Sequence, residues 1–173
     1  MADEVWIPQS AVEETLREYG YKGKVEVVDN GSDFAGNIPV EQLRRSARDK
    51  LRLPSDEFMF LFVGQHIWEK NLEFLLEALA EIRTLPFRMY FIGSGYAASE
   101  LRRKTEDLYL TDKVIFMGSI TERERLKLYY AAADLFLFPS LYDNAPLVVR
   151  EAAAIHTPSI LIKGSNSADE KHD

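Results

Sequence analysis

Two carboxylates flank the start of a predicted helix in the segment "SLYDNAPLVVREAAA", residues 140–154. Pro146 suits the first turn of that helix, where the first backbone N–H groups of about residues 146–149 have no partner within the helix, although Pro146 itself has no N–H. Such a helix start binds anions, and phosphate is a common ligand there. Glu151 follows about five residues later, ~7–8 Å along the axis, where a carboxylate can accept hydrogen bonds from the vicinal hydroxyls of a ribose. Asp143, on the loop side, could reach hydroxyls on the other side of a diphosphate.

Two further turns combine glycine with groups that suit a phosphate. In "FVGQHIWEKN", Gly64 closes an apolar run and permits a tight turn, and Lys70 follows near the next helix start. A lysine is poorly placed there for the helix dipole, and an anionic ligand would remove that conflict. In "FIGSGYAASEL", Gly93 and Gly95 allow close approach of the backbone to a ligand, although a G-x-G without a third glycine is a weak fingerprint.

Each of these turns also has a purely structural interpretation. Asp143 or Asn144 could cap the helix while Glu151 is a surface residue. Lys70 could be a solvated lysine whose stem lies along the surface. The two glycines could belong to an ordinary turn between a strand and a helix. Spacing alone leaves both interpretations open at all three turns.

The elements that must position these residues follow from the hydrophobic pattern. Short apolar runs occur at 5–8, 25–28, 58–64, 88–93, 114–118, 134–139 and 159–162, and helix-like segments at 10–19, 39–51, 70–84, 97–109, 122–133 and 145–155. The central runs are nearly continuous in apolar residues, which is typical of strands covered on both faces. The alternation predicts an α/β fold with a doubly wound, mostly parallel, Rossmann-like sheet and helices on both faces. Ligands bind such sheets beyond the C-terminal ends of the strands, where the three turns would meet.

Composition excludes several classes of function. The net charge of −7 argues against binding of nucleic acid, which needs a basic face. The absence of cysteine excludes disulfides, zinc thiolate sites and a cysteine nucleophile, and the three histidines show no metal spacing, so we expect no metal and no cofactor. We expect no transmembrane segment and no signal peptide, and therefore a cytoplasmic setting.

Five segments together resemble a known family. They are "DEVWIPQSAVEETL", "VVDNGSD", "FVGQHIWEKNLEFLLEAL", "IGSG" with "VIFMGSI", and "FPSLYDNAPLVVREAAA". In this order they are similar to the interdomain link, the asparagine-glycine-x-aspartate turn, the glycine-arginine-x4-lysine segment, the donor-pocket strand ends and the E-x7-E segment of family-4 glycosyltransferases. The chain thus resembles the C-terminal, donor-binding domain of these enzymes, which is one half of a GT-B fold. The combination is specific, although each segment alone is not.

The resemblance implies retaining transfer of a sugar from a nucleotide-sugar, a UDP- or GDP-sugar, without a catalytic metal. It assigns Glu151 to the ribose hydroxyls, Asp143 to hydroxyls of the donor sugar and Lys70 to the phosphates, and we take these three as the catalytic residues. The full set expected at the donor site is Gly64, Gln65, Lys70, Gly93, Gly95, Met117, Gly118, Asp143, Asn144, Pro146, Leu147, Val148 and Glu151. Two positions depart from the family pattern. Gln65 replaces a phosphate-binding arginine, and Asp143 is one methylene shorter than the usual glutamate.

The resemblance also divides the chain. Residues 1–28 are expected to be the link from a missing N-terminal acceptor domain, packed on the sheet, and residues 29–173 the donor-binding domain, truncated at its C-terminus. We expect the full-length protein to be a hexosyltransferase of polysaccharide or glycolipid biosynthesis, peripheral at the membrane, and the isolated chain to bind donor but to be inactive. Alternatives are one half of a nucleotide-sugar epimerase, or a non-catalytic module that binds a partner or has a structural role.

Overall fold

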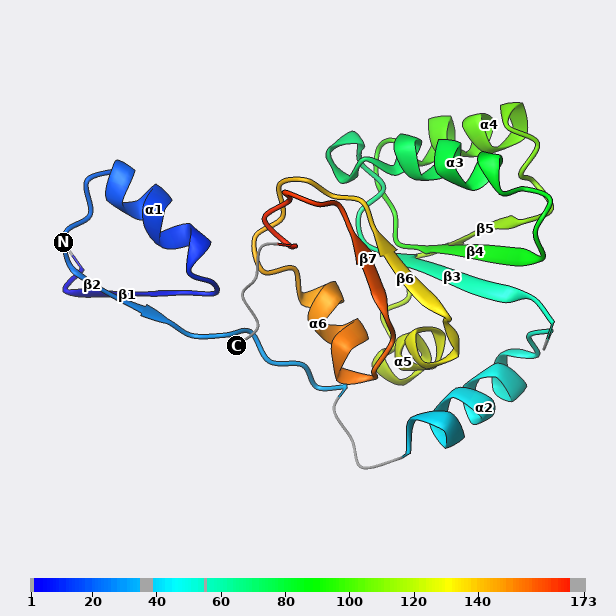
Figure 1. Ribbon diagram of the computed structural model, residues 1–173, viewed down its shortest axis with the longest axis horizontal. Helices are drawn as coiled ribbons and strands as arrows, with labels where there is room; N and C mark the ends of the chain where they lie inside the picture. Colours follow the sequence, from blue (N-terminus) through cyan, green and yellow to red (C-terminus); the bar gives the residue numbers. More distant parts are fainter. Residues whose placement is uncertain (1, 35–38, 55, 169–173) are drawn as a thin grey trace.

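A five-stranded parallel sheet with the order β5–β4–β3–β6–β7 forms the centre of the protein (Figure 1). The structure, a computed structural model, describes residues 2–34, 39–54 and 56–168. The strands are β3 (Phe58–Val63), β4 (Phe87–Ile92), β5 (Val114–Gly118), β6 (Leu135–Phe138) and β7 (Ser159–Leu161). The chain order reverses between β3 and β6, so the predicted doubly wound, parallel sheet is confirmed.

Helices cover both faces of this sheet, as predicted (Figure 1). One face carries α3 (Leu72–Glu81) and α4 (Ala98–Asp107); the other carries α5 (Arg123–Ala132) and α6 (Leu147–Ala154), with α2 (Val40–Leu51) packed on α5. The predicted helix at 70–84 starts at Leu72, because Asn71 adopts a left-handed conformation (φ 56°) after the short 3₁₀ helix η1 (Trp68–Lys70). The leucines of α3 at helical spacing are buried in the core: Leu72, Leu75, Leu76 and Leu79.

Aromatic side chains fill the space between the sheet and its helices. Phe62 at the end of β3 stacks on Phe138 of β6, with ring centroids 6.2 Å apart. Phe91 of β4 stacks in the same way on Phe116 of β5, at 5.1 Å. Because the central strands are buried on both faces, their apolar residues run continuously instead of alternating.

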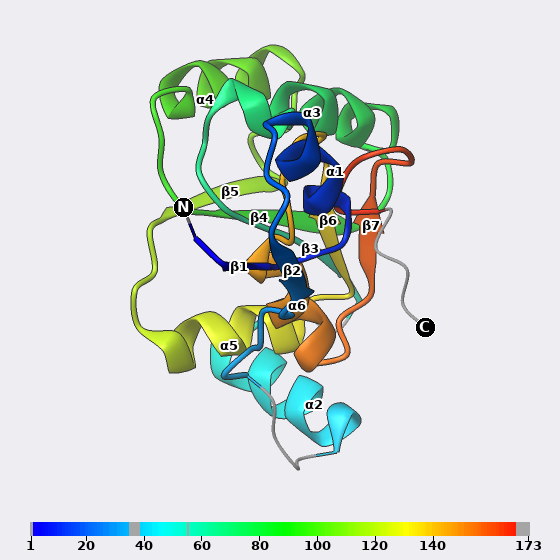
Figure 2. The ribbon, with the colours of Figure 1, turned by 90° about the vertical axis from the view of Figure 1, so that its left-hand side faces the viewer.

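The first elements of the chain form a separate small unit, which we call the N-terminal unit. It consists of β1 (Glu4–Ile7), α1 (Ala11–Glu18) and β2 (Lys24–Val27), and the two strands pair in parallel with each other. The Lys24 ammonium bridges the carboxylates of Glu4 and Glu26 on the exposed side of this pair. Figures 1 and 2 show the N-terminal unit beside the loops of the large sheet, and hydrogen bonds join it to the β6–α6 loop.

The segment between the N-terminal unit and α2 is only partly described. Residues 35–38 lie outside the described residues, as do residues 169–173 of the predicted domain 29–173. Phe34, the last described residue before the gap, is buried and packs edge-on against Tyr130, with ring centroids 5.6 Å apart. In the described ranges, no helix has the length and apolar character that a membrane span requires.

Candidate functional site

Three loops meet at the C-terminal edge of the large sheet and form the candidate site. In the β3–α3 loop, the Asn71 side-chain amide donates to the Pro139 carbonyl oxygen at 3.3 Å, which ties this loop to the end of β6. The His66 N–H donates to the Ser94 carbonyl oxygen at 3.0 Å, which ties the same loop to the β4–α4 loop. The glycine turns, Lys70 and the start of α6 therefore belong to one edge of the molecule.

Lys70 and Asp143 form an ion pair between two of these loops. The Lys70 Nζ lies 2.5 Å from Oδ1 and 2.6 Å from Oδ2 of Asp143. Both side chains are mostly buried, with 17% and 24% of their surface exposed. The interpretation of Lys70 as a solvated lysine is therefore wrong. A lysine near a helix start is unfavourable unless a negative charge lies beside it, and in this structure the Asp143 carboxylate supplies that charge.

The start of α6 keeps backbone donors free of helical partners. Pro146 (φ −65°) directly precedes Leu147, the first helical residue. The Val149 N–H donates to the Pro146 carbonyl oxygen at 3.1 Å. The N–H groups of Leu147 and Val148 come before this first helical bond, so the helix does not use them. They are the donors that an anion at this helix start would meet.

Side chains near this helix start have partners other than its backbone N–H groups. Within the described residues, no side-chain hydrogen bond caps α6. The Asn144 Oδ1 accepts hydrogen bonds from Asn166 at 2.8 Å and from Gln9 at 3.5 Å, and Asp143 binds Lys70. The interpretation in which Asp143 or Asn144 caps the helix is therefore wrong.

Glu151 is buried on α6, with 8% of its surface exposed, so the interpretation as a surface residue is also wrong. Its Oε2 accepts a hydrogen bond from the Tyr130 hydroxyl at 2.9 Å. The Arg123 guanidinium lies 2.7 Å from its Oε1. Burial raises the pKa of Tyr130, and the neighbouring Glu151 carboxylate adds to that increase. The tyrosine therefore stays a hydrogen-bond donor that fixes the orientation of the carboxylate.

Arg123 links Glu151 to the turn that follows the N-terminal unit. Its Nε donates to the Asp33 Oδ2 at 3.1 Å, its Nη2 also pairs with Asp33, and its guanidinium lies 4.1 Å from the centre of the Phe34 ring. The hydrogen bonds to Asp33 raise the pKa of Arg123, and the same contact lowers the pKa of Asp33. Both groups are therefore charged at neutral pH, and Arg123 connects two acids.

Sequence reasoning missed Tyr130 and Arg123, although a signal existed for each. Arg123 is the first residue of α5, and a cation at a helix N-terminus is unfavourable for the dipole. The same conflict pointed to Lys70. Tyr130 stands on the buried face of α5, and a buried tyrosine hydroxyl usually has a hydrogen-bond partner. Neither signal identifies the partner as Glu151.

The glycines of the β4–α4 loop have a packing role. A Cβ atom at Gly93 would collide with the Gly64 carbonyl oxygen, and one at Gly95 would collide with the His66 carbonyl oxygen. Gly93 also adopts a φ of +136°, which side chains disfavour. The neighbouring β3–α3 loop therefore accounts for both glycines, and contact with a ligand there stays a prediction.

The other predicted residues also lie at this edge. The Gly93 N–H donates to the Gly118 carbonyl oxygen at 2.9 Å, which joins the end of β5 to the β4–α4 loop. Gln65 is exposed beside Gly64, and Met117 is half-buried at the end of β5. The edge can therefore present backbone and side-chain groups on both sides of the Lys70–Asp143 pair.

His66 is the buried histidine of this region, with 1% of its surface exposed. It packs between Phe62, Phe91 and Phe116, and its Nε2 has no hydrogen-bond partner among the described residues. Burial lowers the pKa of His66, and the Arg102 cation lowers it further. The ring is therefore neutral at neutral pH. In the described ranges, no group of three or more His, Asp or Glu side chains could hold a metal ion.

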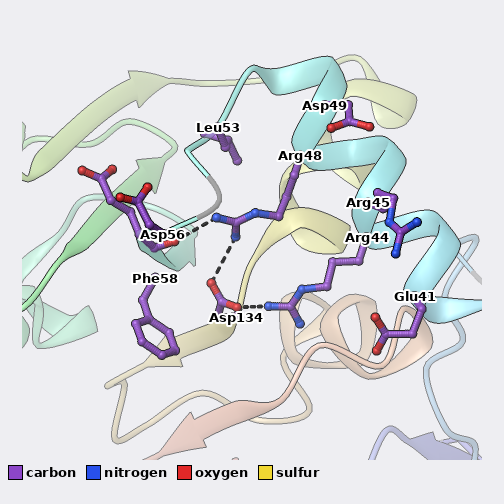
Figure 3. Close-up of a pocket in the computed structure, with 10 residues that line it drawn as sticks. Glu41, Arg44, Arg45, Arg48, Asp49, Leu53, Asp56, Phe58 and Asp134 are labelled. Atoms are coloured by element: carbon purple, nitrogen blue, oxygen red, sulfur yellow. Dashed lines mark hydrogen bonds and ion pairs between the residues drawn. The ribbon is translucent and has the colours of Figure 1, made fainter.

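A polar hollow lies at the opposite, N-terminal edge of the sheet, between α2 and the start of β6 (Figure 3). We call it the α2 hollow; its volume is about 380 Å³, and it is lined by Glu41, Arg44, Arg45, Arg48, Asp49, Leu53, Asp56, Glu57, Phe58 and Asp134. At its base Asp134 pairs with Arg44, and the Arg48 Nη1 lies 3.2 Å from its Oδ2. The Asp134 Oδ2 also accepts the Met59 N–H at 2.7 Å. These contacts join α2 to the sheet, so Arg44, Arg48 and Asp134 serve the fold.

Comparison with known proteins gives one family for most of the chain. The family model described as "Glycosyl transferases group 1" matches residues 44–170. The alpha-monoglucosyldiacylglycerol synthase of Streptococcus pneumoniae is 30% identical over 164 residues, which are 91% of this chain and 37% of that protein. A putative teichuronic acid biosynthesis glycosyltransferase of Bacillus subtilis is 33% identical over 143 residues, which are 82% of this chain and 33% of that protein. The chain thus spans about a third of the length of these relatives.

The chain also matches solved structures with the same fold, and each match covers less than half of the solved chain. The sucrose-phosphate synthase of Thermosynechococcus elongatus is 31% identical, with a TM-score of 0.77, and the match covers 93% of this chain and 41% of that one. HepE of Anabaena, solved in complex with UDP, gives a TM-score of 0.82 at 19% identity, over 98% of this chain and 47% of that one. The second likeness shows the fold alone. These neighbours are GT-B glycosyltransferases, and the five-stranded parallel sheet with helices on both faces matches their architecture.

Proposed function

Because the chain belongs to the glycosyl transferases group 1 family, we propose that it is the C-terminal, donor-binding domain of a family-4 glycosyltransferase. The full-length protein would be a hexosyltransferase that moves a sugar from a nucleotide-sugar to an acceptor, with retention of the anomeric configuration and without a catalytic metal. The observation that carries the proposal is the position of Lys70, Asp143 and Glu151 around the start of α6.

In this proposal the diphosphate of the donor binds between Lys70 and the start of α6. The N–H groups of Leu147 and Val148 precede the first helical bond and can donate to phosphate oxygens. The Lys70 ammonium adds a full positive charge beside them. Negative charge builds up on the diphosphate as it leaves the sugar, and fixed donors and a cation stabilise that charge in the transition state. Gln65 adds no charge, so Lys70 carries this task without the arginine of related enzymes.

The two carboxylates act on opposite sides of the diphosphate. Glu151 is already oriented by Tyr130 and Arg123, so it can accept hydrogen bonds from both ribose hydroxyls without losing many conformations. Asp143 lies on the loop side, where hydroxyls of the donor sugar would reach it. Its pair with Lys70 must open or be shared when the diphosphate binds, because one ammonium then serves two anions.

The remaining parts of the enzyme lie outside this chain. Residues 1–28 would be the link from an N-terminal acceptor domain, because the chain spans only 33–37% of the relatives described above. Without that domain, we expect the 173-residue chain to bind donor but not to transfer sugar. One relative is named for a glycolipid product and another for teichuronic acid biosynthesis, so the acceptor would be a lipid or a growing polysaccharide. The setting would be cytoplasmic, and the full-length protein peripheral at the membrane.

Titration calorimetry of the chain with UDP, GDP and their glucose conjugates tests this proposal. We expect one base to be preferred, and Glu151→Ala to raise its Kd about 30-fold because two hydrogen bonds to a charged group are lost. The matched control is Glu106→Ala, an exposed glutamate of α4. Absence of binding by all four compounds would contradict the donor-site proposal and favour a non-catalytic module. A Glu151→Ala variant that binds as tightly as the control would remove Glu151 from the site.

A further inference from the structure

Gln9 reaches from the N-terminal unit into the loop that precedes α6. It follows β1, and its side chain is buried, with 5% of its surface exposed. Its Oε1 accepts the Ala145 N–H at 2.9 Å, and its Nε2 lies 3.5 Å from the Asn144 Oδ1. Both contacts span more than 130 residues of sequence, so they fix how two distant parts of the chain meet.

The turn that Gln9 holds is a strained one. Ala145 is buried and has a φ of 43°, in the left-handed region that alanine disfavours. A conformation of this kind persists only where surrounding contacts determine it. Gln9 binds the N–H of Ala145, and the Asn30 side-chain amide donates to its carbonyl oxygen at 3.2 Å. Both polar groups of the strained residue are therefore held from the N-terminal side of the chain.

This turn sets the direction of the backbone donors at α6. Ala145 is followed by Pro146 and then by Leu147 and Val148, whose N–H groups form the proposed diphosphate site. A change at Ala145 would reorient Pro146 and move both donors. The other side of the turn leads to Asp143, so the same residue also sets the position of the proposed sugar-binding carboxylate.

We propose that Gln9 is a positioning residue for the donor site, through which the placement of the N-terminal unit controls how well the α6 turn binds a diphosphate. The effect of Gln9 on diphosphate binding rests on the proposed function. Its effect on the Ala145 turn does not, and can be measured without a ligand. Gln9 contacts Asn144 of the expected donor site, but the Leu147 and Val148 N–H groups, the proposed phosphate donors, are not among its hydrogen-bond partners in the described residues. It acts on them through the Ala145 turn.

Gln9→Met tests the inference, because methionine keeps the length and volume of glutamine and removes its hydrogen bonds. The matched control is Gln42→Met, on the exposed surface of α2. Hydrogen exchange of the 173-residue chain without ligand should show the Ala145 amide exchanging about tenfold faster in Gln9→Met and unchanged in Gln42→Met. Calorimetry should show the Kd for UDP raised about fivefold in Gln9→Met alone, because one positioning hydrogen bond is lost.

Gln9→Glu separates positioning from general destabilisation. Glutamate keeps an oxygen that can accept the Ala145 N–H, so slow exchange of that amide should return. The UDP affinity of this variant is not compared with the others, because its added negative charge repels a diphosphate. Unchanged Ala145 exchange in Gln9→Met would overturn the inference, and so would faster exchange with unchanged UDP affinity. If UDP does not bind the unmodified chain, the proposed function fails. Selective exchange at Ala145, restored by Gln9→Glu, would then still support the positioning role of Gln9.

Discussion

Asp134 and Asp143 stand at the two ends of β6, and both are paired with cations, but the two pairs differ in how completely each carboxylate is bound. Asp134, at the N-terminal end, binds Arg44 and Arg48 and accepts a backbone N–H of β3. Asp143, at the C-terminal end, binds only the ammonium of Lys70 through its side chain in the described part of the protein. Several fixed donors hold the two oxygens of Asp134, whereas one flexible ammonium holds both oxygens of Asp143.

The difference follows from the architecture of a doubly wound sheet. At the N-terminal edge, α2 must be attached to the sheet, and the Arg48 guanidinium also donates to the carbonyl oxygens of Ala132 and Glu57. Its five donors match several fixed acceptors at once. At the C-terminal edge a lysine can rotate its ammonium from one oxygen to another at little cost. The cavity at the N-terminal edge is therefore a by-product of structural charges, whereas the Lys70 ammonium at the C-terminal edge is free to turn toward an anionic ligand in the proposed function.

The largest expected effect is on stability, at the N-terminal edge. Asp134→Asn removes the negative charge that two arginines share, and we expect a loss of about 3 kcal/mol in the free energy of unfolding. Urea denaturation measures it. The matched control is Asp49→Asn, an exposed position of α2 in the same α2 hollow, which should change stability by less than about 0.5 kcal/mol. Equal losses of stability in both variants would show that Asp134 contributes no more than an exposed acid of the same hollow. The contrast between the two ends of β6 would then be wrong.

The second effect is on ligand binding, at the C-terminal edge. Lys70→Met should raise the Kd for UDP about 30-fold, because a charge-assisted contact to phosphate is lost. The unfolding free energy should fall by about 1–2 kcal/mol, less than in Asp134→Asn, because Asp143 loses a single partner and 24% of its side chain is exposed to water. Calorimetry and urea denaturation of the same sample measure both quantities. Lys50→Met on α2 is the control. A large loss of stability with unchanged UDP affinity would make the Lys70–Asp143 pair structural, like the pair at Asp134.

The fold was accessible from the sequence because its signals are local. Nearly continuous apolar runs, such as residues 58–64, predicted strands covered on both faces, and their alternation with helix-like segments predicted the parallel sheet. Pairing between distant strands leaves no such local signal. The hydrophobic pattern of 5–8 and 25–28 did not reveal that β1 and β2 pair with each other and, among the described strands, with no strand of the large sheet.

The site was only partly accessible, for the same physical reason. A cation at a helix start and a proline in a first helical turn are local conflicts and preferences, and they drew attention to Lys70 and Pro146. The partners of Glu151 were not accessible, because a hydrogen bond from Tyr130 depends on how α5 packs against α6. Gln9 gave no signal at all, since its role arises from a contact across 136 residues.

The third prediction concerns the pH dependence of stability, which His66 at the C-terminal edge should control. His66 is buried at the C-terminal edge, and its pKa in the folded protein is lowered from the ordinary value of about 6.5. The unfolded chain then binds a proton more readily, so stability is complete above about pH 6.5 and falls as the pH drops below it. Urea denaturation at pH 7.5 and 5.5 should show this loss in the unmodified chain and a smaller one in His66→Leu. An identical loss in both proteins would assign the acid sensitivity to other groups.

The smallest expected effect tests what Asp143 contacts once its pair with Lys70 opens. Asp143→Glu keeps the charge and the pair but extends the carboxylate by one methylene, to the length usual in family-4 enzymes. If Asp143 binds the donor sugar, the Kd for UDP-glucose should change by about two- to fourfold, while the Kd for UDP, which lacks the glucose, stays the same. The measurement is the ratio of the two constants by calorimetry. Equal shifts for both ligands would show that Asp143 acts through Lys70 on the diphosphate. The carboxylate at the C-terminal end of β6 would then be a partner of the cation, as Asp134 is at the other end, and not a contact of the sugar.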